Sequence, residues 1–230
     1  MNRSLQINRH SRWLGMAALT LVAISQPAAN LPNFERIIQT AQQRYGARAV
    51  QTVNQWQDLI QAVQSQPEAE QVRRINEFFN RRIAYGEDIE IWKQNDFWAT
   101  PLETMGRGAG DCEDYSIAKY FSLRFLGVPN QKLRITYVKA KIGGLNSDIT
   151  QAHMVLGYYP DPAAEPLILD NLITDLRPAS RRPDLSPVFS FNSEGLWVGD
   201  AAQTNPAGSA TARLSRWRDL IARMQAEGFE

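Results

Sequence analysis

The fold of this chain is decided by the stretch Gly110-Asp-Cys-Glu-Asp-Tyr-Ser-Ile-Ala-Lys-Tyr120, which contains the only cysteine of the sequence. Residues 116–126 hold neither glycine nor proline and are followed by both, so they predict a helix with a defined C-terminal end. Asp111 is a good N-cap, which places Cys112 in the first helical turn. Backbone N–H groups and the positive end of the helix dipole favour a thiolate there. The stretch therefore predicts a nucleophilic cysteine.

The alternative for a lone cysteine is a structural role, because free cysteines are more often small buried apolar residues than nucleophiles. Here the flanking residues Asp111, Glu113 and Asp114 are charged, which argues against an apolar pocket. The glycine-rich run over residues 106–110 would let a substrate backbone approach the sulfur. We therefore favour the functional interpretation.

The N-terminal segment has the layout of a secretory signal peptide. Arg3, Arg9 and Arg12 precede an apolar run over residues 13–24, which is too short to span a membrane. Small residues follow, so cleavage is expected between residues 25 and 29. An uncleaved N-terminal anchor is the alternative. We predict a signal peptide over residues 1–29, and no direct membrane insertion once it is cleaved.

Residues 30–230 are predicted to form one domain, because about 200 residues suit a single full core. Removal of residues 1–29 takes away three arginines and no acid, which changes the formal net charge from +1 to −2. This charge, without a basic stripe interleaved with aromatic residues, argues against nucleic acid as a partner. A single cysteine forms no internal disulfide, and in an oxidising compartment it is a liability unless it is used.

The hydrophobic pattern predicts helices before the cysteine and at the end of the chain. Apolar residues recur at three- and four-residue spacing over residues 32–82, with breaks at Gly46 and Pro67. This spacing indicates two or three helices, whose aromatic residues are expected to form core rather than a ligand site. A last helix over residues 211–225 is expected to dock on the body.

Strands are predicted after the cysteine helix. Residues 133–139, 152–159 and 166–171 are rich in β-formers, and their short connections indicate antiparallel neighbours. Residues 178–206 mix prolines, polar residues and aromatics, which predicts a long surface excursion with one more short strand at 195–198.

Catalysis by a cysteine needs a base to hold the proton and a third group to orient that base. His153 is the only histidine outside the signal segment, since the other is His10. His153 begins one predicted strand and Asp170 lies near the end of the next, so antiparallel pairing would place them side by side. Each residue alone has an ordinary structural explanation, but the joint pattern predicts a triad with Cys112. Zinc is disfavoured because one cysteine and one histidine are too few for a usual site.

Several motifs together resemble the bacterial transglutaminase-like cysteine proteinases. They are Trp98-Ala-Thr-Pro-x-Glu103, Gly110-Asp-Cys-Glu-Asp-Tyr115, Ala118-Lys-Tyr120, Ala152-His-Met-Val-Leu156 and Leu169-Asp-Asn171. The similarity spans residues 34–200. The resemblance implies an α+β fold of the papain/transglutaminase type, in which N-terminal helices and a nucleophile-bearing helix pack on an antiparallel sheet. It also implies Cys112 as nucleophile, His153 as base and Asp170 as the orienting residue.

For function, the resemblance implies a periplasmic, calcium-dependent cysteine endopeptidase. Its substrate would be a large repeat adhesin of the cell surface, cleaved near its N-terminus at an Ala-Ala site so that cells leave a biofilm. In this family an inner-membrane receptor that senses cyclic di-GMP sequesters the protease. That receptor is therefore the expected inhibitory partner.

The acids beside the cysteine point to a metal. Uncompensated carboxylates would raise the pKa of the thiol, and a hard divalent cation with oxygen ligands, such as calcium, would offset them. The alternative is that Asp111 only caps the helix and Asp114 is only an acidic residue of its first turn, with no metal bound. Family members bind calcium through the acids that flank the cysteine, so the resemblance implies Asp111 and Glu113 as calcium ligands.

Other functions remain open at the level of sequence. The same triad could transfer an acyl group to an amine or hydrolyse cell-wall peptides, and the fold alone does not decide between them. A non-catalytic module that holds an adhesin or receptor in the cleft belongs to a different class. For the oxyanion, the Cys112 backbone N–H is the natural donor. Trp98 is a second candidate by analogy, although packing in the cleft wall is favoured.

Overall fold

Three helices precede the catalytic region, as the hydrophobic spacing predicts. The computed structural model describes residues 31–144, 146–198 and 210–229, so the predicted signal peptide lies outside the described residues. The helices are α1 (Phe34–Tyr45), α2 (Ala47–Val63) and α3 (Glu68–Arg82). Gly46 separates the first two with a φ of 80°, a left-handed conformation that favours glycine. Pro67 immediately precedes the third.

Aromatic residues on these helices form the core, as predicted. The Trp56 side chain is fully buried and lies 5.4 Å from the Phe34 ring and 6.0 Å from the Phe229 ring, measured between centroids. Its indole N–H donates to the Ser122 hydroxyl at 2.9 Å, so the polar edge of the ring is also satisfied. Burial of one large side chain contributes about 2–3 kcal/mol. This cluster therefore joins helices from the start, middle and end of the chain.

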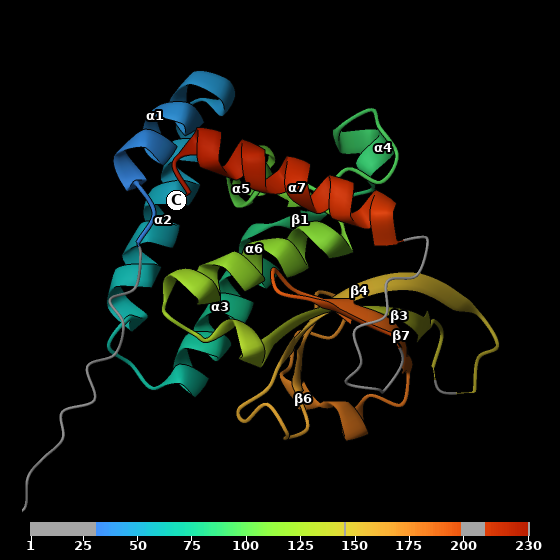
Figure 1. The fold of residues 1–230 in the computed structure, drawn as a ribbon. Helices are drawn as coiled ribbons and strands as arrows, with labels where there is room; N and C mark the ends of the chain where they lie inside the picture. Colours follow the sequence, from blue (N-terminus) through green and yellow to red (C-terminus); the bar gives the residue numbers. More distant parts are fainter. Residues whose placement is uncertain (1–30, 145, 199–209, 230) are drawn as a thin grey trace, which may run out of the picture.

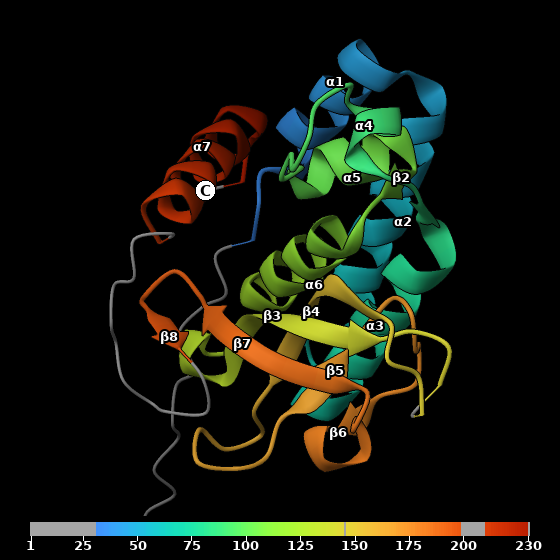
Figure 2. The same ribbon diagram turned by 90° about the vertical axis from the view of Figure 1, so that its right-hand side faces the viewer.

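Short elements link the helices to the cysteine. They are β1 (Ala84–Tyr85), α4 (Asp88–Ile91), α5 (Pro101–Arg107) and β2 (Ala109–Gly110). The two short strands pair in parallel, which fixes the end of α3 beside the residues that lead into the cysteine helix. This helix, α6 (Cys112–Phe125), lies between α5 and the C-terminal helix on one side and the sheet on the other (Figures 1 and 2).

A six-stranded antiparallel sheet forms the second layer. Its spatial order is β6-β5-β4-β3-β7-β8, and α6 covers the face that includes Leu133, Ile135 and Leu156. The sheet and its short 3-10 turns comprise η1 (Asn130–Lys132), β3 (Leu133–Lys141), β4 (Thr150–Tyr158), β5 (Leu167–Leu169), β6 (Arg177–Pro178), η2 (Ala179–Arg181), β7 (Leu185–Phe191) and β8 (Leu196–Val198). The predicted α+β fold, with the nucleophile helix on an antiparallel sheet, is confirmed.

The predicted surface excursion over residues 178–206 is wrong over β7. This strand pairs with β3 inside the sheet, and its register shifts where Val138 faces Pro187. A proline has no N–H to give to a ladder, so it occurs at such irregularities. Because of this proline, the sequence pattern does not predict a strand here. The strand is recognised only from its pairing with β3.

The last helix docks on the body as expected. Helix α7 (Ala210–Glu227) buries Trp217, Leu220 and Met224, and lies on the side of α6 away from the sheet (Figures 1 and 2). The Trp217 ring stacks on Phe121 of α6, with 5.5 Å between centroids. Among the residues that the structure describes, no helix has the length and apolar character needed to cross a membrane.

Candidate active site

Cys112 is the first residue of α6, as predicted from Asp111 as its N-cap. The helix start is held by the buried carboxylate of Asp114. One of its oxygens accepts the Asp111 N–H at 3.3 Å, and the other accepts the Ala99 N–H at 2.8 Å. The second bond ties the nucleophile helix to the residues just before α5. The position of the sulfur is therefore set by contacts distant in sequence.

Two of the glycines ahead of the cysteine are required by close packing. A Cβ on Gly110 would lie 2.8 Å from the Asp114 Cβ, and one on Gly106 would overlap the Tyr45 ring. Gly108 ends α5 with a φ of 67°, in the left-handed region. These contacts give the glycines at 106 and 110 a structural requirement, and access of a substrate backbone to the sulfur stays a prediction.

His153 and Asp170 lie side by side on neighbouring strands. His153 is near the start of β4, and Asp170 directly follows β5, which pairs with β4. The His153 Nε2 atom is 2.8 Å from Asp170 Oδ1, and both side chains are buried. The Leu172 N–H donates to the same oxygen at 3.0 Å. Because Nε2 faces the carboxylate, Nδ1 is the ring nitrogen left for the thiol.

Cys112 and His153 line one cleft of about 300 Å³, together with Trp98, Tyr137 and Met154. The Cys112 thiol donates to Glu113 Oε2, with 3.0 Å between sulfur and oxygen, and the Met154 backbone N–H bonds the sulfur. Burial, followed by the charges of Glu113 and Asp111, raises the pKa of the Cys112 thiol well above its usual range. The helix N-terminus alone therefore does not ionise this cysteine.

The carboxylates beside the cysteine form a site suited to a hard cation. Carboxylate oxygens of Asp88, Asp111 and Asp114 lie within 4.8 Å of one another, and all three residues are buried. In a second group, oxygens of Asp111 and Glu113 and the sulfur of Cys112 also lie within 4.8 Å of one another. Asp111 Oδ1 and Asp88 Oδ1 are buried without a hydrogen-bond partner among the described residues. Unpaired buried oxygens close together are the donor set that calcium prefers.

The electrostatics of this cluster support the same conclusion. Burial raises the pKa of Asp88 to about 6, and burial followed by repulsion from Glu113 raises the pKa of Asp111 well above its usual range. Such groups must either hold protons or neutralise their charge with a cation. The structure brings together the predicted pair, Asp111 and Glu113. It adds Asp114 and Asp88, and no local pattern links Asp88 to the cysteine because it lies in another element.

The Asp170 main chain is held by residues absent from the sequence prediction. Lys119 of α6 donates from Nζ to the Asp170 carbonyl at 3.2 Å and to Asn80 Oδ1 at 2.8 Å. Asn80 of α3 also donates to that carbonyl, at 2.8 Å. Burial lowers the pKa of Lys119 to about 7. The Ala118-Lys-Tyr120 motif is a signal for this residue, but its role needs the tertiary contact.

Trp98 belongs to the cleft wall. Its ring is buried and stacks on Phe191, with 5.4 Å between centroids. The indole N–H donates to Asp96 Oδ1 at 3.2 Å, so it already has an acceptor. The packing interpretation of Trp98 therefore fits, and the Cys112 backbone N–H remains the oxyanion donor of choice.

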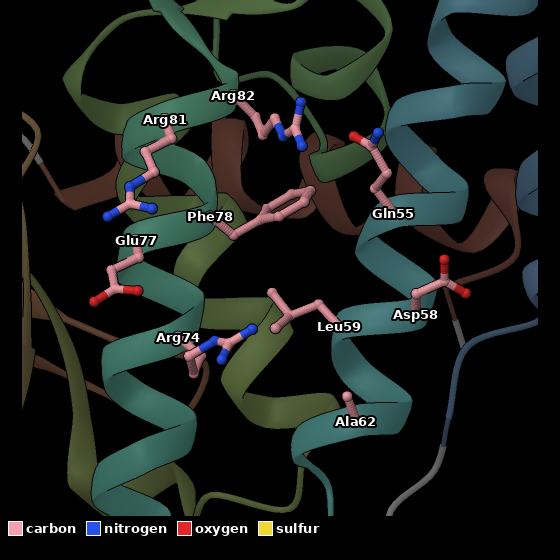
Figure 3. Close-up of a pocket in the computed structure, with 9 residues that line it drawn as sticks. All are labelled: Gln55, Asp58, Leu59, Ala62, Arg74, Glu77, Phe78, Arg81 and Arg82. Carbon is pink, nitrogen blue, oxygen red and sulfur yellow. The ribbon is translucent and has the colours of Figure 1, made fainter.

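A larger groove of about 580 Å³ lies elsewhere, between α2 and α3 (Figure 3). Leu59 and Phe78 point toward each other across it, and arginines and acids surround them. Its lining contains neither a cysteine nor a histidine. Chemistry rather than size therefore identifies the smaller cleft as the candidate active site.

A cysteine at a helix N-terminus shares a cleft with a histidine that is hydrogen-bonded to a buried aspartate. This is the arrangement expected of a cysteine protease, and comparison with known families gives the same class. The chain belongs to the bacterial transglutaminase-like cysteine proteinases (BTLCP), whose family model matches residues 40–183. Its fold is accordingly transglutaminase-like.

Among solved structures, the chain is similar to LapG of Legionella pneumophila, with 40% sequence identity and a TM-score of 0.69, over 84% of this chain and 98% of that one. EGTA-treated and calcium-bound structures of that protein match with TM-scores of 0.70 and 0.67, each at 40% identity, over 84% and 83% of this chain and 98% of those chains. Comparison with curated proteins finds no match.

Proposed function

We propose that this chain is a periplasmic, calcium-dependent cysteine endopeptidase that cleaves a large surface adhesin near its N-terminus at an Ala-Ala site. Cleavage would release cells from a biofilm. The observation that carries the proposal is the shared cleft, in which Cys112 lies at a helix N-terminus beside the hydrogen-bonded His153–Asp170 pair. Membership of a cysteine proteinase family supports the reaction class.

The mechanism follows from the three side chains. His153 takes the thiol proton on Nδ1, and the Cys112 sulfur attacks the scissile carbonyl carbon. Asp170 holds the ring through Nε2, while the Cys112 backbone N–H donates to the oxyanion. As the C–N bond breaks, His153 passes its proton to the leaving amine and a thioester remains. His153 then takes a proton from water, which attacks the thioester and frees the cysteine.

Calcium is proposed to bind at Asp111 and Glu113, with Asp114 and Asp88 completing the group of carboxylates. Legionella pneumophila LapG has a calcium-bound structure, and the buried unpaired oxygens of this chain suit the same ion. When bound, the ion would neutralise the carboxylates and so favour the thiolate. The chain's own residues supply every proton transfer.

Location and regulation are part of the proposal. The arginines and short apolar run of residues 1–29 support export to the periplasm through a cleaved signal peptide. The expected inhibitor is an inner-membrane receptor for cyclic di-GMP, proposed on the family resemblance.

The test is digestion of an N-terminal adhesin fragment that contains an Ala-Ala site, with and without a calcium chelator. We expect Cys112→Ala to abolish cleavage while the protein stays folded, because the nucleophile is lost and only a small side chain changes. Mass spectrometry of the products separates hydrolysis from amide transfer. Cleavage by the Cys112→Ala variant would overturn the mechanism, and cleavage that survives chelation would remove calcium from it.

A non-catalytic binding module predicts a different result. In that case Cys112 would resist a small alkylating agent at neutral pH in calcium-containing buffer, and no adhesin fragment would be cut. Rapid alkylation of Cys112 supports the protease.

A further inference from the structure

Arg182 is a buried arginine that contacts the candidate triad. It follows η2, in the segment that the sequence predicts to be a surface excursion, yet its side chain is only 1% exposed. Its NH2 atom donates to Asp170 Oδ2 at 2.7 Å. This is the oxygen of the Asp170 carboxylate that does not face His153. Arg182 therefore contacts Asp170 through the carboxylate oxygen opposite the one that bonds His153.

A second acid holds the arginine in turn. Asp184 accepts from Arg182 Nε at 3.0 Å through Oδ1 and from NH2 at 2.7 Å through Oδ2. A two-point contact of this kind fixes the plane of a guanidinium group. The Asp184 backbone carbonyl accepts the Lys141 N–H at 2.8 Å at the end of β3. The arginine is thus anchored, through Asp184, to the end of a strand inside the sheet.

We propose that Arg182 is a positioning residue of the active site, which orients Asp170 through its second carboxylate oxygen and is itself oriented by Asp184. The proposal rests on the proposed protease function, because it assigns Arg182 to the line Cys112–His153–Asp170. Arg182 touches no reacting atom. It acts by fixing the rotation of the Asp170 carboxylate and by keeping that group ionised.

The groups around Asp170 show that Arg182 helps, together with His153 and Leu172, to keep the carboxylate ionised. Burial raises the pKa of Asp170, but hydrogen bonds from His153, Leu172 and Arg182 outweigh it and lower the value to about 2. The other charged groups are Lys119, which reaches the Asp170 carbonyl from α6, and Asp184 behind Arg182. Without Arg182, Oδ2 would be a buried anionic oxygen that has lost its partner.

A purely structural role for Arg182 predicts different behaviour. If the arginine only secures η2 to the sheet, its loss would lower thermal stability and leave the pH dependence of catalysis unchanged. If it positions Asp170, its loss would lower kcat and move the acid limb of the pH profile to higher pH. The two roles are therefore separable by kinetics.

The experiment compares the full-length protein with Arg182→Met, Arg182→Lys and Arg177→Met, in excess calcium, on a peptide that contains the scissile bond. Arg177→Met is the matched control, since Arg177 is an exposed arginine of β6 in the same region. We expect Arg182→Met to lose about 10- to 100-fold in kcat, in the range known for residues that orient catalytic ligands. KM should change little, and the acid limb should move to higher pH.

Arg182→Lys keeps the positive charge, so its acid limb should stay near that of the parent with a smaller loss of kcat. Arg177→Met should match the parent. Parent-like kcat in Arg182→Met, or a lower Tm with an unchanged acid limb, would overturn the positioning role.

Failure of the protease proposal gives a separate result. The rate at which iodoacetamide alkylates Cys112 at one fixed pH needs no substrate, and it depends on how well His153 can take the thiol proton. If the parent cleaves no peptide, slower alkylation in Arg182→Met than in the parent still supports the positioning of Asp170. Equal rates would reject it.

Discussion

Among single residues, the acids beside Cys112 matter most, because the chemistry of the thiol depends on how their negative charge is compensated. Asp88 and Asp111 each keep a buried oxygen without a hydrogen-bond partner among the described residues. Glu113 meanwhile accepts a hydrogen bond from the thiol itself. The same carboxylates are therefore expected to destabilise the protein without a cation and to provide its affinity for one.

Replacing Asp88 with Asn tests this balance. The amide oxygen can still accept the Phe97 N–H that Asp88 accepts, while one of the buried like charges is gone. We expect Asp88→Asn to raise Tm in EGTA by about 2–4 °C for each kcal/mol of repulsion removed. It should also reduce the rise in Tm that calcium produces. Differential scanning fluorimetry in EGTA and in calcium measures both effects.

Asp58→Asn is the control, since Asp58 is exposed on α2 and distant in the fold from the cluster. A calcium-induced rise in Tm that is equal in Asp88→Asn and the parent would exclude Asp88 from the cation site.

At the scale of elements, the start of α6 is the point on which the site depends. The buried Asp114 carboxylate bonds both the N-cap of α6 and the Ala99 N–H, and Gly110 leaves the room that it needs. Parallel pairing of Gly110 with Tyr85 holds the incoming chain from the other side. Cys112 is thereby carried by a helix end that is bonded on both sides rather than by a loop.

Gly110→Ala should therefore disturb activity through packing alone. Its Cβ would meet Asp114 at 2.8 Å, closer than such atoms can lie, so the carboxylate or the strand must shift. We expect a loss of stability of about 1–3 kcal/mol, the usual cost of overpacking, and a larger proportional loss of kcat. Chemical denaturation and peptide cleavage measure the two.

The control is Gly144→Ala in the loop after β3, which also replaces a glycine with alanine. A Cβ at this position meets nothing within 4 Å, so any effect comes only from the backbone strain at its φ of 102°. Unchanged kcat in Gly110→Ala would show that the contact with Asp114 does not position the sulfur.

At the scale of the whole molecule, a buried acid outside the cleft lining also affects stability. Glu227 near the end of α7 is fully buried, and its carboxylate accepts from the Thr100 hydroxyl at 2.6 Å and from Arg44 at 2.8 Å. These contacts join the C-terminal helix to α1 and to the cap of α5. Burial, the largest cause, raises the pKa of Glu227 to about 7.

The sign of the pH dependence follows from this raised pKa. Between about pH 4.5 and 7 the folded protein holds a proton on Glu227 that the unfolded chain has released, so stability falls as pH rises through this window. Asp88, with a pKa raised to about 6, acts in the same direction when no cation is present. We expect Glu227→Gln to remove about 3 kcal/mol of this decline, because the two pKa values differ by about 2.5 units and each unit corresponds to ~1.4 kcal/mol.

Denaturant unfolding at pH 4.5, 6 and 7.5 in EGTA measures this slope for the parent and for Glu227→Gln. A slope that is identical in the two proteins would mean that Glu227 does not titrate in this window.

Much of the architecture is predictable because it depends on local rules. Glycine at position 46 and proline at position 67 interrupt the helices where expected, and apolar spacing gives their buried faces. Residues 133–139 alternate strongly enough to be recognised as a strand, and the mostly apolar run over residues 152–159 indicates a second. Strand β7 escapes the sequence pattern because Pro187 interrupts it, and only pairing with β3 makes it a strand.

Residue type and local spacing are enough to predict a nucleophilic cysteine, its helix, the histidine available to it and the acids that flank it. Which distant groups complete the site follows from the three-dimensional fold. Asp88 joins Asp111, Lys119 reaches the Asp170 carbonyl, and Arg182 pairs with the Asp170 carboxylate. Burial and Coulomb energy depend on distances in space, so residues far apart in the chain acquire these roles only when the fold brings them together.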